Sequence, residues 1–254
     1  MIYGLWQSAG GLQAQEYRQT LLANNLANVD TPGYRADRVA FIERLNAASA
    51  RGTPGPQAPN LRGMTGGVFE TEVYTDYAFA NSRLTPTGNP LDVGLEGEGF
   101  LVVQSPAGPR YTRDGRMVMD SSGTLRHAAS GHPLLDTAGQ PVMLDPASRR
   151  GVKIDERGSI RQGDTVVGQL AVVDFSDRRV LRKDGQNLFT AEAAPDRGAT
   201  GRVRQAVVEE SSVDAAGTLV EMIAAMRAYE ANARLISLQD ESLGRVVNDL
   251  GRVS

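Results

Sequence analysis

The sequence predicts an α+β protein in which N- and C-terminal helices pair as a coiled coil, with a central all-β domain and an extended linker. Apolar residues recur at spacings of three and four near both ends, as is typical of coiled-coil helices. Between these ends, short alternating runs are separated by turn residues, which indicates strands and hairpins. We therefore assign residues 1–34 and 206–254 to the helical ends, 35–84 to the linker and 85–205 to the β domain.

The C-terminal segment carries the clearest helical pattern. Alternating steps of three and four lead from Leu219 to Leu250, and Asp240 alone interrupts an otherwise apolar series. Charged residues lie off this series, so the spacing predicts a long helix with a coiled-coil seam. The predicted seam residues are Leu219, Met222, Met226, Tyr229, Ala233, Ile236, Leu243, Val247 and Leu250.

The N-terminal segment predicts a second helix over residues 3–28. Its seam is weaker, because glutamines interrupt the apolar residues Leu5, Leu12, Leu22 and Leu26. Part of this helix therefore needs a partner other than the C-terminal helix. Because burial of one apolar stripe recovers little of the entropy lost on ordering a long helix, we expect contacts with other subunits or disorder in the free monomer.

The middle of the chain changes character twice. Residues 51–67 hold five glycines and three prolines, a composition that resists regular structure. Beyond Val68 the alternating runs begin, and Asp-Gly and similar pairs predict hairpin turns at Gly115, Gly123, Gly158 and Gly185. Residues 119–126 and 154–161 share the pattern apolar-Asp-x-x-Gly-x-apolar-Arg, which fits either a common hairpin rule or a true duplication.

Composition excludes several classes of protein. The 254 residues carry a net charge of −3 with acids and bases mixed, which argues against a nucleic-acid partner. The absence of cysteine excludes thiol catalysis and disulfides. No run approaches the roughly 20 apolar residues of a membrane helix, so we expect no membrane insertion. The N-terminus lacks the basic and apolar regions of a cleaved secretory signal.

We find no constellation of residues that predicts catalysis, a metal site or a cofactor. His127 and His132 lie five residues apart in a turn-rich region without a neighbouring carboxylate cluster, so we interpret them as solvated turn residues. Gly97-Glu98-Gly99 lacks the remaining residues of a phosphate loop, so close backbone packing or a bulge explains it better. We therefore predict that the chain is not an enzyme.

The stretch LLANNLANVDTPGYR, residues 21–35, raises a separate question. Asn28 suits a helix C-terminus, and Pro32-Gly33 suits the centre of a type II turn. Neither rule explains Asn24 and Asn25. One interpretation is that their amides bond to helices of neighbouring subunits and set their register; the other is plain solvation.

Three motifs of the sequence resemble those of one protein family. LANNLANVDTPGY (residues 22–34) and VEMIAAMRAYEANARLI (220–236) resemble the terminal motifs of the bacterial flagellar rod and hook proteins, and residues 87–125 resemble the β-rich segment of the rod proteins. The residues that carry the terminal motifs are Asn24, Asn25, Leu26, Ala27, Asn28, Thr31, Pro32, Gly33, Tyr34, Tyr229, Glu230 and Asn232.

The resemblance implies a structural subunit of the flagellar basal-body rod. Such a subunit would leave the cytoplasm unfolded through the flagellar type III export apparatus without a cleaved signal. It would then polymerise with copies of itself, between other rod proteins, into a helical tube that crosses the periplasm and transmits torque from motor to hook. The paired terminal helices would line the tube, and the β domain would lie outside. NPLDV and GHPLL favour a proximal-rod member, whereas the long linker and TRDG fit a distal-rod member.

Two alternatives to this interpretation differ in class. The first is a monomeric or small-oligomer binding module, in which hairpins present a ligand surface and the helices close the fold. The second is a secreted hydrolase with a β-rich body, which would need a carboxylate pair in one concave pocket.

Overall fold

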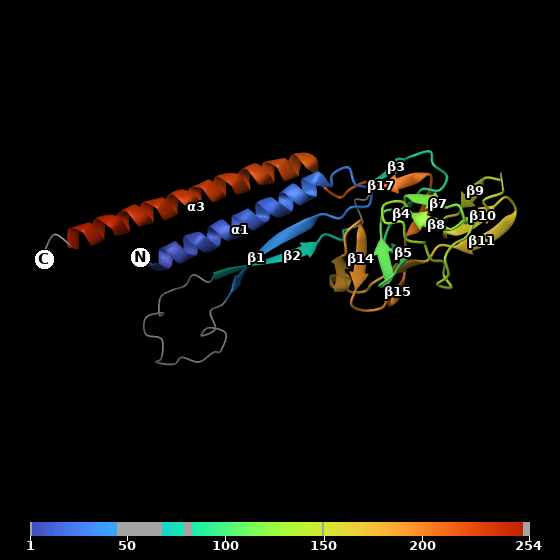
Figure 1. The fold of residues 1–254 in the computed structure, drawn as a ribbon, viewed down its shortest axis with the longest axis horizontal. Helices are drawn as coiled ribbons and strands as arrows, with labels where there is room; N and C mark the ends of the chain where they lie inside the picture. The colour runs from blue at the N-terminus through green and yellow to red at the C-terminus, as the bar shows by residue number, and fades with distance from the viewer. Residues whose placement is uncertain (1, 45–67, 79–82, 149, 251–254) are drawn as a thin grey trace. The chain divides into compact units, whose positions relative to one another are not determined.

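The computed structural model describes residues 2–44, 68–78, 83–148 and 150–250 and confirms the α+β class (Figure 1). The chain forms two compact units. The helical unit comprises Met1–Ala27, Asp37–Thr75 and Asp214–Ser254, and the β unit comprises Asn28–Ala36 and Asp76–Val213. Each unit is therefore assembled from segments that are separated in the sequence.

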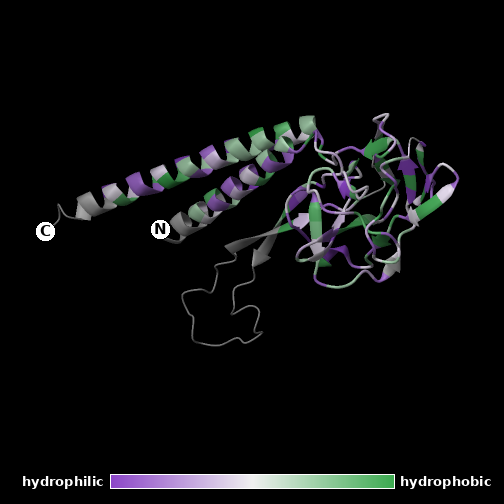
Figure 2. Cartoon of the chain, turned by 45° about the vertical axis from the view of Figure 1, so that its right-hand side comes forward, coloured by the Kyte–Doolittle hydropathy of each residue, from purple (hydrophilic) through white to green (hydrophobic). Residues whose placement is uncertain are grey.

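Two long antiparallel helices dominate the helical unit. Helix α1 spans Ile2–Ala27, close to the predicted residues 3–28, and helix α3 spans Ala215–Leu250. The predicted helical end 206–254 begins too early, because Val207–Glu209 form strand β17 of the β unit. The Arg18 guanidinium lies 3.2 Å from the Glu221 carboxylate across the pair, and Figures 1 and 2 show the helices side by side. Neither helix contains proline, and alanine is frequent in both, which favours helix in each segment.

A two-stranded ribbon completes the helical unit. Strands β1 (Asp37–Arg44) and β2 (Val68–Thr75) pair antiparallel, with Asp37 opposite Thr75. Both strands lie inside the range 35–84, so this range is not an extended linker throughout. Residues 51–67, whose composition predicted irregular structure, lie outside the described part of the chain.

The β unit is built from short antiparallel strands. Its largest sheet has the order β13-β14-β6-β5-β12-β15, and β11-β10-β9 form a second sheet. Three further two-stranded pairs are β16-β4, β17-β3 and β7-β8. The elements are β3 (Leu84–Pro86), β4 (Val93–Glu96), β5 (Phe100–Ser105), β6 (Gly108–Thr112), β7 (Met117–Met119), β8 (Leu125–His127), β9 (Val152–Ile154), β10 (Ser159–Gln162), β11 (Thr165–Gln169), β12 (Val172–Asp174), η1 (Arg178–Val180), β13 (Leu181–Lys183), β14 (Leu188–Ala191), β15 (Arg197–Gly198), β16 (Arg202–Gln205) and β17 (Val207–Glu209).

Two hydrophobic clusters stabilise this unit. The larger is aliphatic and joins residues of several sheets, including Leu95, Leu101 and Ile160. The second is mainly aromatic. In it, the rings of Tyr111 and Phe175 pack edge to face with their centroids 4.9 Å apart. Because strands of two to six residues bury little area each, the unit needs side chains from many strands to form a core.

Three Asp-x-x-Gly turns of the β unit share one hydrogen-bond pattern. In each, the aspartate Oδ1 accepts bonds of 2.8–2.9 Å from the backbone N–H groups two and four residues later. The glycine adopts φ of 75–85°, which side-chain-bearing residues rarely adopt. Two of these turns, at Asp120 and Asp155, are the echo in the sequence, and the third is at Asp136. Recurrence outside the echo favours the common hairpin rule over duplication.

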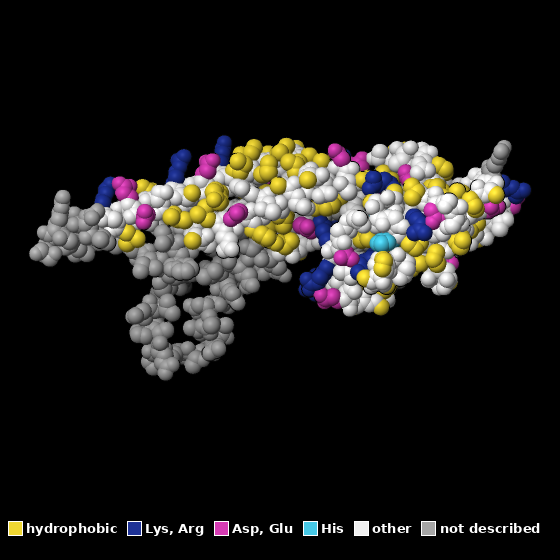
Figure 3. Space-filling view, in the orientation of Figure 1, with side chains coloured by type: hydrophobic (Ala, Val, Ile, Leu, Met, Phe, Trp, Pro, Cys, Tyr) yellow, Lys and Arg dark blue, Asp and Glu magenta, His cyan; other side chains and the backbone are white. Residues whose placement is uncertain are grey.

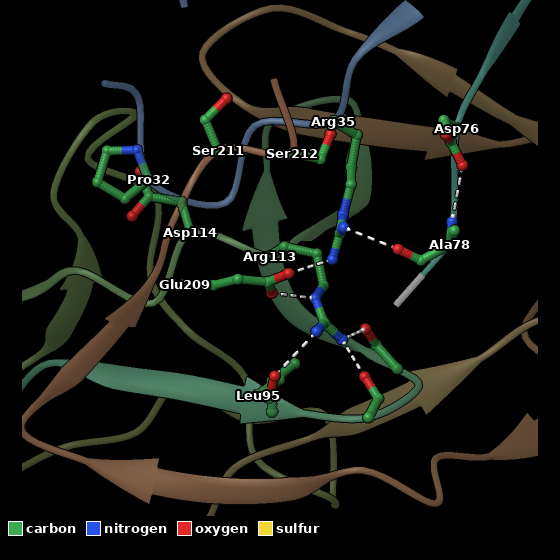
Figure 4. Close-up of polar contacts among 12 residues, drawn as sticks. Pro32, Arg35, Asp76, Ala78, Leu95, Arg113, Asp114, Glu209, Ser211 and Ser212 are labelled. Atoms are coloured by element: carbon green, nitrogen blue, oxygen red, sulfur yellow. Dashed lines mark hydrogen bonds and ion pairs between the residues drawn. The ribbon is translucent and has the colours of Figure 1, made fainter. Parts of the chain in front are cut away.

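A buried ion cluster lies at the centre of the β unit (Figure 4). Glu209, on β17, pairs through one carboxylate oxygen with Arg35 and through the other with Arg113 Nε, at 2.6 Å. All three side chains are buried. Burial lowers the pKa of Arg35 to about 10 against the opposing effect of Glu209, and it likewise lowers the pKa of Arg113. One carboxylate therefore serves two buried guanidinium groups.

Backbone carbonyls satisfy the rest of Arg113. Its Nη1 donates to the carbonyls of Gly97 and Gly99, at 2.9 and 2.6 Å, and its Nη2 donates to Leu95 at 2.9 Å. A side chain at Gly99 would meet the Ala199 Cβ at 2.6 Å, so glycine is required by close packing. The structure thus confirms the close-packing interpretation of Gly97-Glu98-Gly99, which binds a guanidinium rather than a phosphate.

Asp114-Gly115 is not the hairpin turn that the sequence predicted. It joins β6 to β7, which belong to different sheets, and Asp114 is buried. Its carboxylate pairs with Arg116 at 2.6 Å, and His127 Nε2 lies 3.4 Å away. A Cβ at Gly115 would come within 1.7 Å of the Val93 carbonyl. The glycine therefore marks a close backbone approach rather than a reversal of the chain.

The charges of the ion cluster predict how the effects of its substitutions on the free energy of unfolding combine. Replacing Glu209 by Met leaves two buried guanidinium groups without their carboxylate, so E209M should lower the free energy of unfolding by about 3–5 kcal/mol. R35M should cost less, because Glu209 keeps Arg113. The double variant R35M/E209M should be more stable than E209M, since it buries one uncompensated cation fewer. Denaturant unfolding followed by near-UV circular dichroism measures all three values.

The exposed pair of Arg182 and Glu192 provides the matched control. E192M should change the free energy of unfolding by about 0–1 kcal/mol, as expected for a solvated ion pair. A double variant R35M/E209M that is less stable than E209M would contradict the proposed charge balance.

Asp114 predicts an acid dependence. Burial acts to raise the pKa of Asp114, but Arg116 and His127 beside the carboxylate hold it below the ordinary value of 3.8. The stabilisation is therefore complete above pH of about 4 and is lost as pH falls through the lower folded-state pKa. The difference in free energy of unfolding between wild type and D114N should narrow in that acid range. A constant difference from pH of about 6 to 2 would contradict this assignment.

Candidate assembly surface

The face of α3 that packs toward α1 mixes small, polar and large apolar side chains. Ala225 is buried there, and Asn232 lies so close to α1 that a Cβ at Gly11 would meet its Nδ2 at 3.2 Å. The amide oxygens of Gln15 and Gln239 are buried and have no hydrogen-bond partner among the described residues. Each such group costs about 1–3 kcal/mol, so this helix pair is not optimised for burial. The inward face comprises Met222, Ala225, Ala228, Asn232, Ile236, Gln239 and Leu243.

The predicted seam of α3 lies partly to one side of this inward face. Met222, Ala233, Ile236 and Leu243 are half-buried, whereas Leu219, Met226 and Tyr229 are exposed. At about 100° per residue, these exposed side chains lie along one flank of the helix. We name Leu219, Met226 and Tyr229 the first stripe. The side chains of Val247 and Leu250 lie outside the described residues.

A second exposed apolar stripe occupies the opposite flank of α3. It consists of Val220, Leu235 and Leu238, of which Leu238 is 59% exposed. Between the two stripes, the side away from α1 carries exposed charged residues such as Arg227 and Arg234, together with Ile223, which is 51% exposed. Figure 3 shows hydrophobic side chains gathered over the half of α3 nearest its start. The helix therefore exposes more large apolar side chains than it packs against α1.

Helix α1 presents a different surface. Leu22 is buried and Leu12 and Leu26 are half-buried, whereas the side chain of Leu5 is outside the described set. The exposed residues of α1 are mostly small or polar, and Tyr17 is the large apolar exception among the described ones. The two helices thus offer unequal outer faces.

Asn25 has a structural role that the sequence did not predict. Its side chain is buried, donates from Nδ2 to the Asp37 carbonyl at 2.8 Å and accepts from the Asp37 N–H at 3.0 Å. Thr75 Oγ1 donates to the Asp37 carboxylate at 2.8 Å, which ties β2 to the same residue. The interpretation of this amide as a contact to a neighbouring subunit is therefore wrong, because it is fully used in holding the ribbon to α1. Asn24, beside it, is exposed.

The TPGY part of the motif belongs to the β unit. The Tyr34 N–H donates to the Thr31 carbonyl at 3.2 Å and Gly33 has φ of 67°, as in the predicted type II turn. The Gly33 N–H donates to the Glu209 carbonyl at 2.8 Å, and a Cβ at Gly33 would meet the Arg113 backbone at 2.5 Å. The turn therefore places Arg35 in the ion cluster.

The remaining motif residues are distributed as follows. Asn28 Oδ1 accepts from Thr31 Oγ1 at 3.2 Å, and Pro32 is held through its carbonyl by Asn187 Nδ2. Ala27 is the last residue of α1. Tyr229 and Glu230 are exposed on α3. The motif thus combines residues that hold the fold with residues that lie on the surface.

The interpretation of His127 as a solvated turn residue is wrong. The residue is buried, and its Nδ1 lies 2.8 Å from the Ser130 hydroxyl within one tight turn. No group of three or more potential metal ligands occurs in the described part of the chain. None of the helices described there is both long enough and apolar enough to cross a bilayer.

Sequence reasoning missed Arg35, Arg113 and Glu209. Periodicity does not single out an isolated arginine or glutamate that is buried only when three distant segments meet. The available signal was Gly97-Glu98-Gly99, whose backbone freedom the guanidinium exploits.

Asn25 provides a direct test of the helical unit. N25D should remove the bond to the Asp37 carbonyl and bury a carboxylate beside it, lowering the free energy of unfolding by about 1–3 kcal/mol. Thermal unfolding by far-UV circular dichroism and exchange of the Asp37 amide proton measure the effect. Q13E, at an exposed position of α1, is the matched amide-to-acid control and should stay within about 0.5 kcal/mol. An unchanged free energy of unfolding in N25D would refute the anchor role.

Family models match three parts of the chain. "Flagella basal body rod protein" matches residues 7–35, "Flagellar hook protein FlgE/F/G D1 domain" matches residues 94–162, and "Flagellar basal body rod FlgEFG protein C-terminal" matches residues 204–250. These ranges include the motif with Asn25, the buried Arg113 and both stripes of α3.

Whole-length relatives agree with these matches. The flagellar basal-body rod protein FlgF of Mesorhizobium japonicum is 31% identical over 98% of this chain and 98% of its own length. The flagellar basal-body rod protein FlgG of Buchnera aphidicola subsp. Acyrthosiphon pisum is 33% identical over 97% of this chain and 99% of its own. FlgF of Caulobacter vibrioides is 31% identical over 92% of each. The chain therefore belongs to the flagellar basal-body rod protein family, a structural rather than an enzymatic family.

Proposed function

We propose that this chain is a subunit that polymerises into the helical tube of the flagellar rod through both apolar stripes of α3. The observation that carries the proposal is the position of the stripes on opposite flanks of one helix. Family membership supports a structural rod subunit that assembles with itself and with other axial proteins in the basal body. The stripes supply the surface for that assembly.

Two unlike stripes favour a helical polymer over a closed dimer. The first stripe contains Met226 and Tyr229, whereas the second contains only aliphatic side chains such as Leu238. Each flank therefore requires a different neighbour, which makes the contacts heterologous. Repeated heterologous contacts generate rings or open helical assemblies.

We also propose that α1 and α3 act as a coiled coil within the wall. Leu12, Leu22 and Leu26 of α1 and Met222, Ile236 and Leu243 of α3 supply its apolar contacts. The buried glutamine oxygens make this pair weak by itself, which supports stabilisation by neighbouring subunits on the exposed flanks. Leu5, Val247 and Leu250 extend the proposed seam.

The proposed division of labour follows the chain. Residues 1–27, 37–75 and 214–254 make the assembly domain, and residues 28–36 and 76–213 form a β domain outside the tube. The partners are other copies, the rod proteins above and below, and the type III export apparatus. The assembled rod transmits torque from motor to hook across the periplasm.

Within the rod we favour a proximal position, as for FlgF-type proteins, over a distal FlgG-type position. The motifs NPLDV and GHPLL support this choice. Relatives of both types match at similar identity, so a tagged copy located in isolated basal bodies by electron microscopy decides between them.

Charge substitutions test each stripe separately. M226D in the first stripe and L238D in the second should each abolish assembly and motility while the β unit stays folded, because each buries a carboxylate in a subunit contact. I236D places a carboxylate between α1 and α3, and it should likewise abolish assembly and motility while the β unit stays folded. Sedimentation of concentrated protein, electron microscopy and near-UV circular dichroism provide the readouts.

Met143 of the β unit provides the matched control, since it is 57% exposed. M143D should assemble like the wild type. Assembly by both M226D and L238D would refute the stripes as contacts, and persistent wild-type monomers at high concentration in several buffers would favour the monomeric binding-module alternative.

A further inference from the structure

The methionines of this chain occupy unequal environments. Met226 lies in the first stripe and is 48% exposed, and Met222, one turn earlier, is half-buried. Met117 is only 1% exposed in the core of the β unit, whereas Met119 and Met143 lie on its surface. The chain has no cysteine, so no thiol competes with these thioethers for an oxidant.

We propose that Met226 is a reversible oxidation site that controls assembly through the first stripe. The inference rests on the proposed function, since the stripe must be a subunit contact for its polarity to matter. In the free subunit the thioether is accessible to solvent. In the assembled wall the same side chain would be covered by a neighbour, so modification acts on subunits before incorporation.

The chemistry requires a hydroperoxide as a two-electron oxygen donor. The Met226 sulfur attacks the terminal peroxide oxygen, an S–O bond forms and the O–O bond breaks. The sulfur is oxidised to the sulfoxide, and hydrogen peroxide is reduced to water. A dithiol reductase reverses the step, because two thiols become a disulfide, the sulfoxide oxygen leaves as water and the thioether is restored.

The consequence for the stripe is a change of polarity at its centre. The sulfoxide is a polar, chiral group in place of a flexible apolar one, and its oxygen requires a hydrogen-bond partner when buried. Leu219 and Tyr229, which complete the stripe, offer an aliphatic side chain and an aromatic face. An oxidised subunit should therefore add to the wall poorly.

The experiment compares each protein with itself before and after hydrogen peroxide. Purified full-length wild type is treated, the sulfoxide at each methionine is quantified by peptide mass spectrometry, and the critical concentration for assembly is measured by sedimentation. Oxidation should be rapid at Met226, Met119 and Met143 and slow at Met117. The critical concentration should rise at least about tenfold, and a methionine sulfoxide reductase with a dithiol should restore it.

Two variants locate the effect. M226L removes the thioether at little change in volume, so peroxide should raise its critical concentration far less than that of wild type. M119L/M143L removes two exposed thioethers of the β unit, and peroxide should affect it as strongly as wild type. Equal sensitivity of M226L and wild type would overturn the proposal.

The failures of the two proposals can be told apart. If untreated wild type does not assemble, or if M226D and L238D assemble normally, the stripe itself is not a contact. If untreated protein assembles and protein with complete Met226 sulfoxide assembles at the same critical concentration, the contact stands and oxidative control is refuted.

Discussion

The carboxylate of Glu209 is the contact on which the β unit depends most. It pairs with Arg35, which follows the TPGY turn, and with Arg113, which holds the inward-turned carbonyls of Gly97 and Gly99. Three chain segments separated by tens to well over a hundred residues therefore meet at one charge. A buried ion pair is costly to desolvate, and its value lies in excluding other arrangements, because any misplaced segment leaves a guanidinium buried without a counter-charge.

The helical unit follows a different physical logic. Its two helices bury polar side chains such as Gln15 and Gln239 beside apolar ones and expose large apolar side chains on α3. This arrangement is unfavourable for an isolated subunit, because large apolar side chains stay exposed to water and do not contribute to its stability by burial. In the proposed assembly, neighbours would cover both flanks and make this arrangement favourable. The weakness of the isolated pair and the proposed polymerisation would then follow from one distribution of side chains.

Much of the fold could be predicted because its signals are local. Helical periodicity located α1 and α3 closely, the type II turn at Pro32-Gly33 followed from backbone preferences, and the Asp-x-x-Gly turns at Asp120 and Asp155 were visible as a repeated pattern. The ribbon β1–β2 was missed because the glycine-rich stretch between its strands dominated the composition of that region. The prediction of a hairpin turn at Asp114-Gly115 was wrong, because the sequence does not distinguish a glycine needed for close packing from a glycine needed for a turn.

The sequence by itself determined the two long helices, the absence of thiol chemistry and the presence of apolar residues at helical spacing that form the stripes, because each depends on residues near one another in the chain. The tertiary structure alone decided which way those stripes face and which polar residues are buried. Asn25 illustrates the difference. Its residue type in a helix suggested a contact between subunits, yet its amide forms hydrogen bonds with the backbone of Asp37 within the same unit. Hydrogen-bond partners and burial depend on segments distant in sequence, so spacing cannot reveal them.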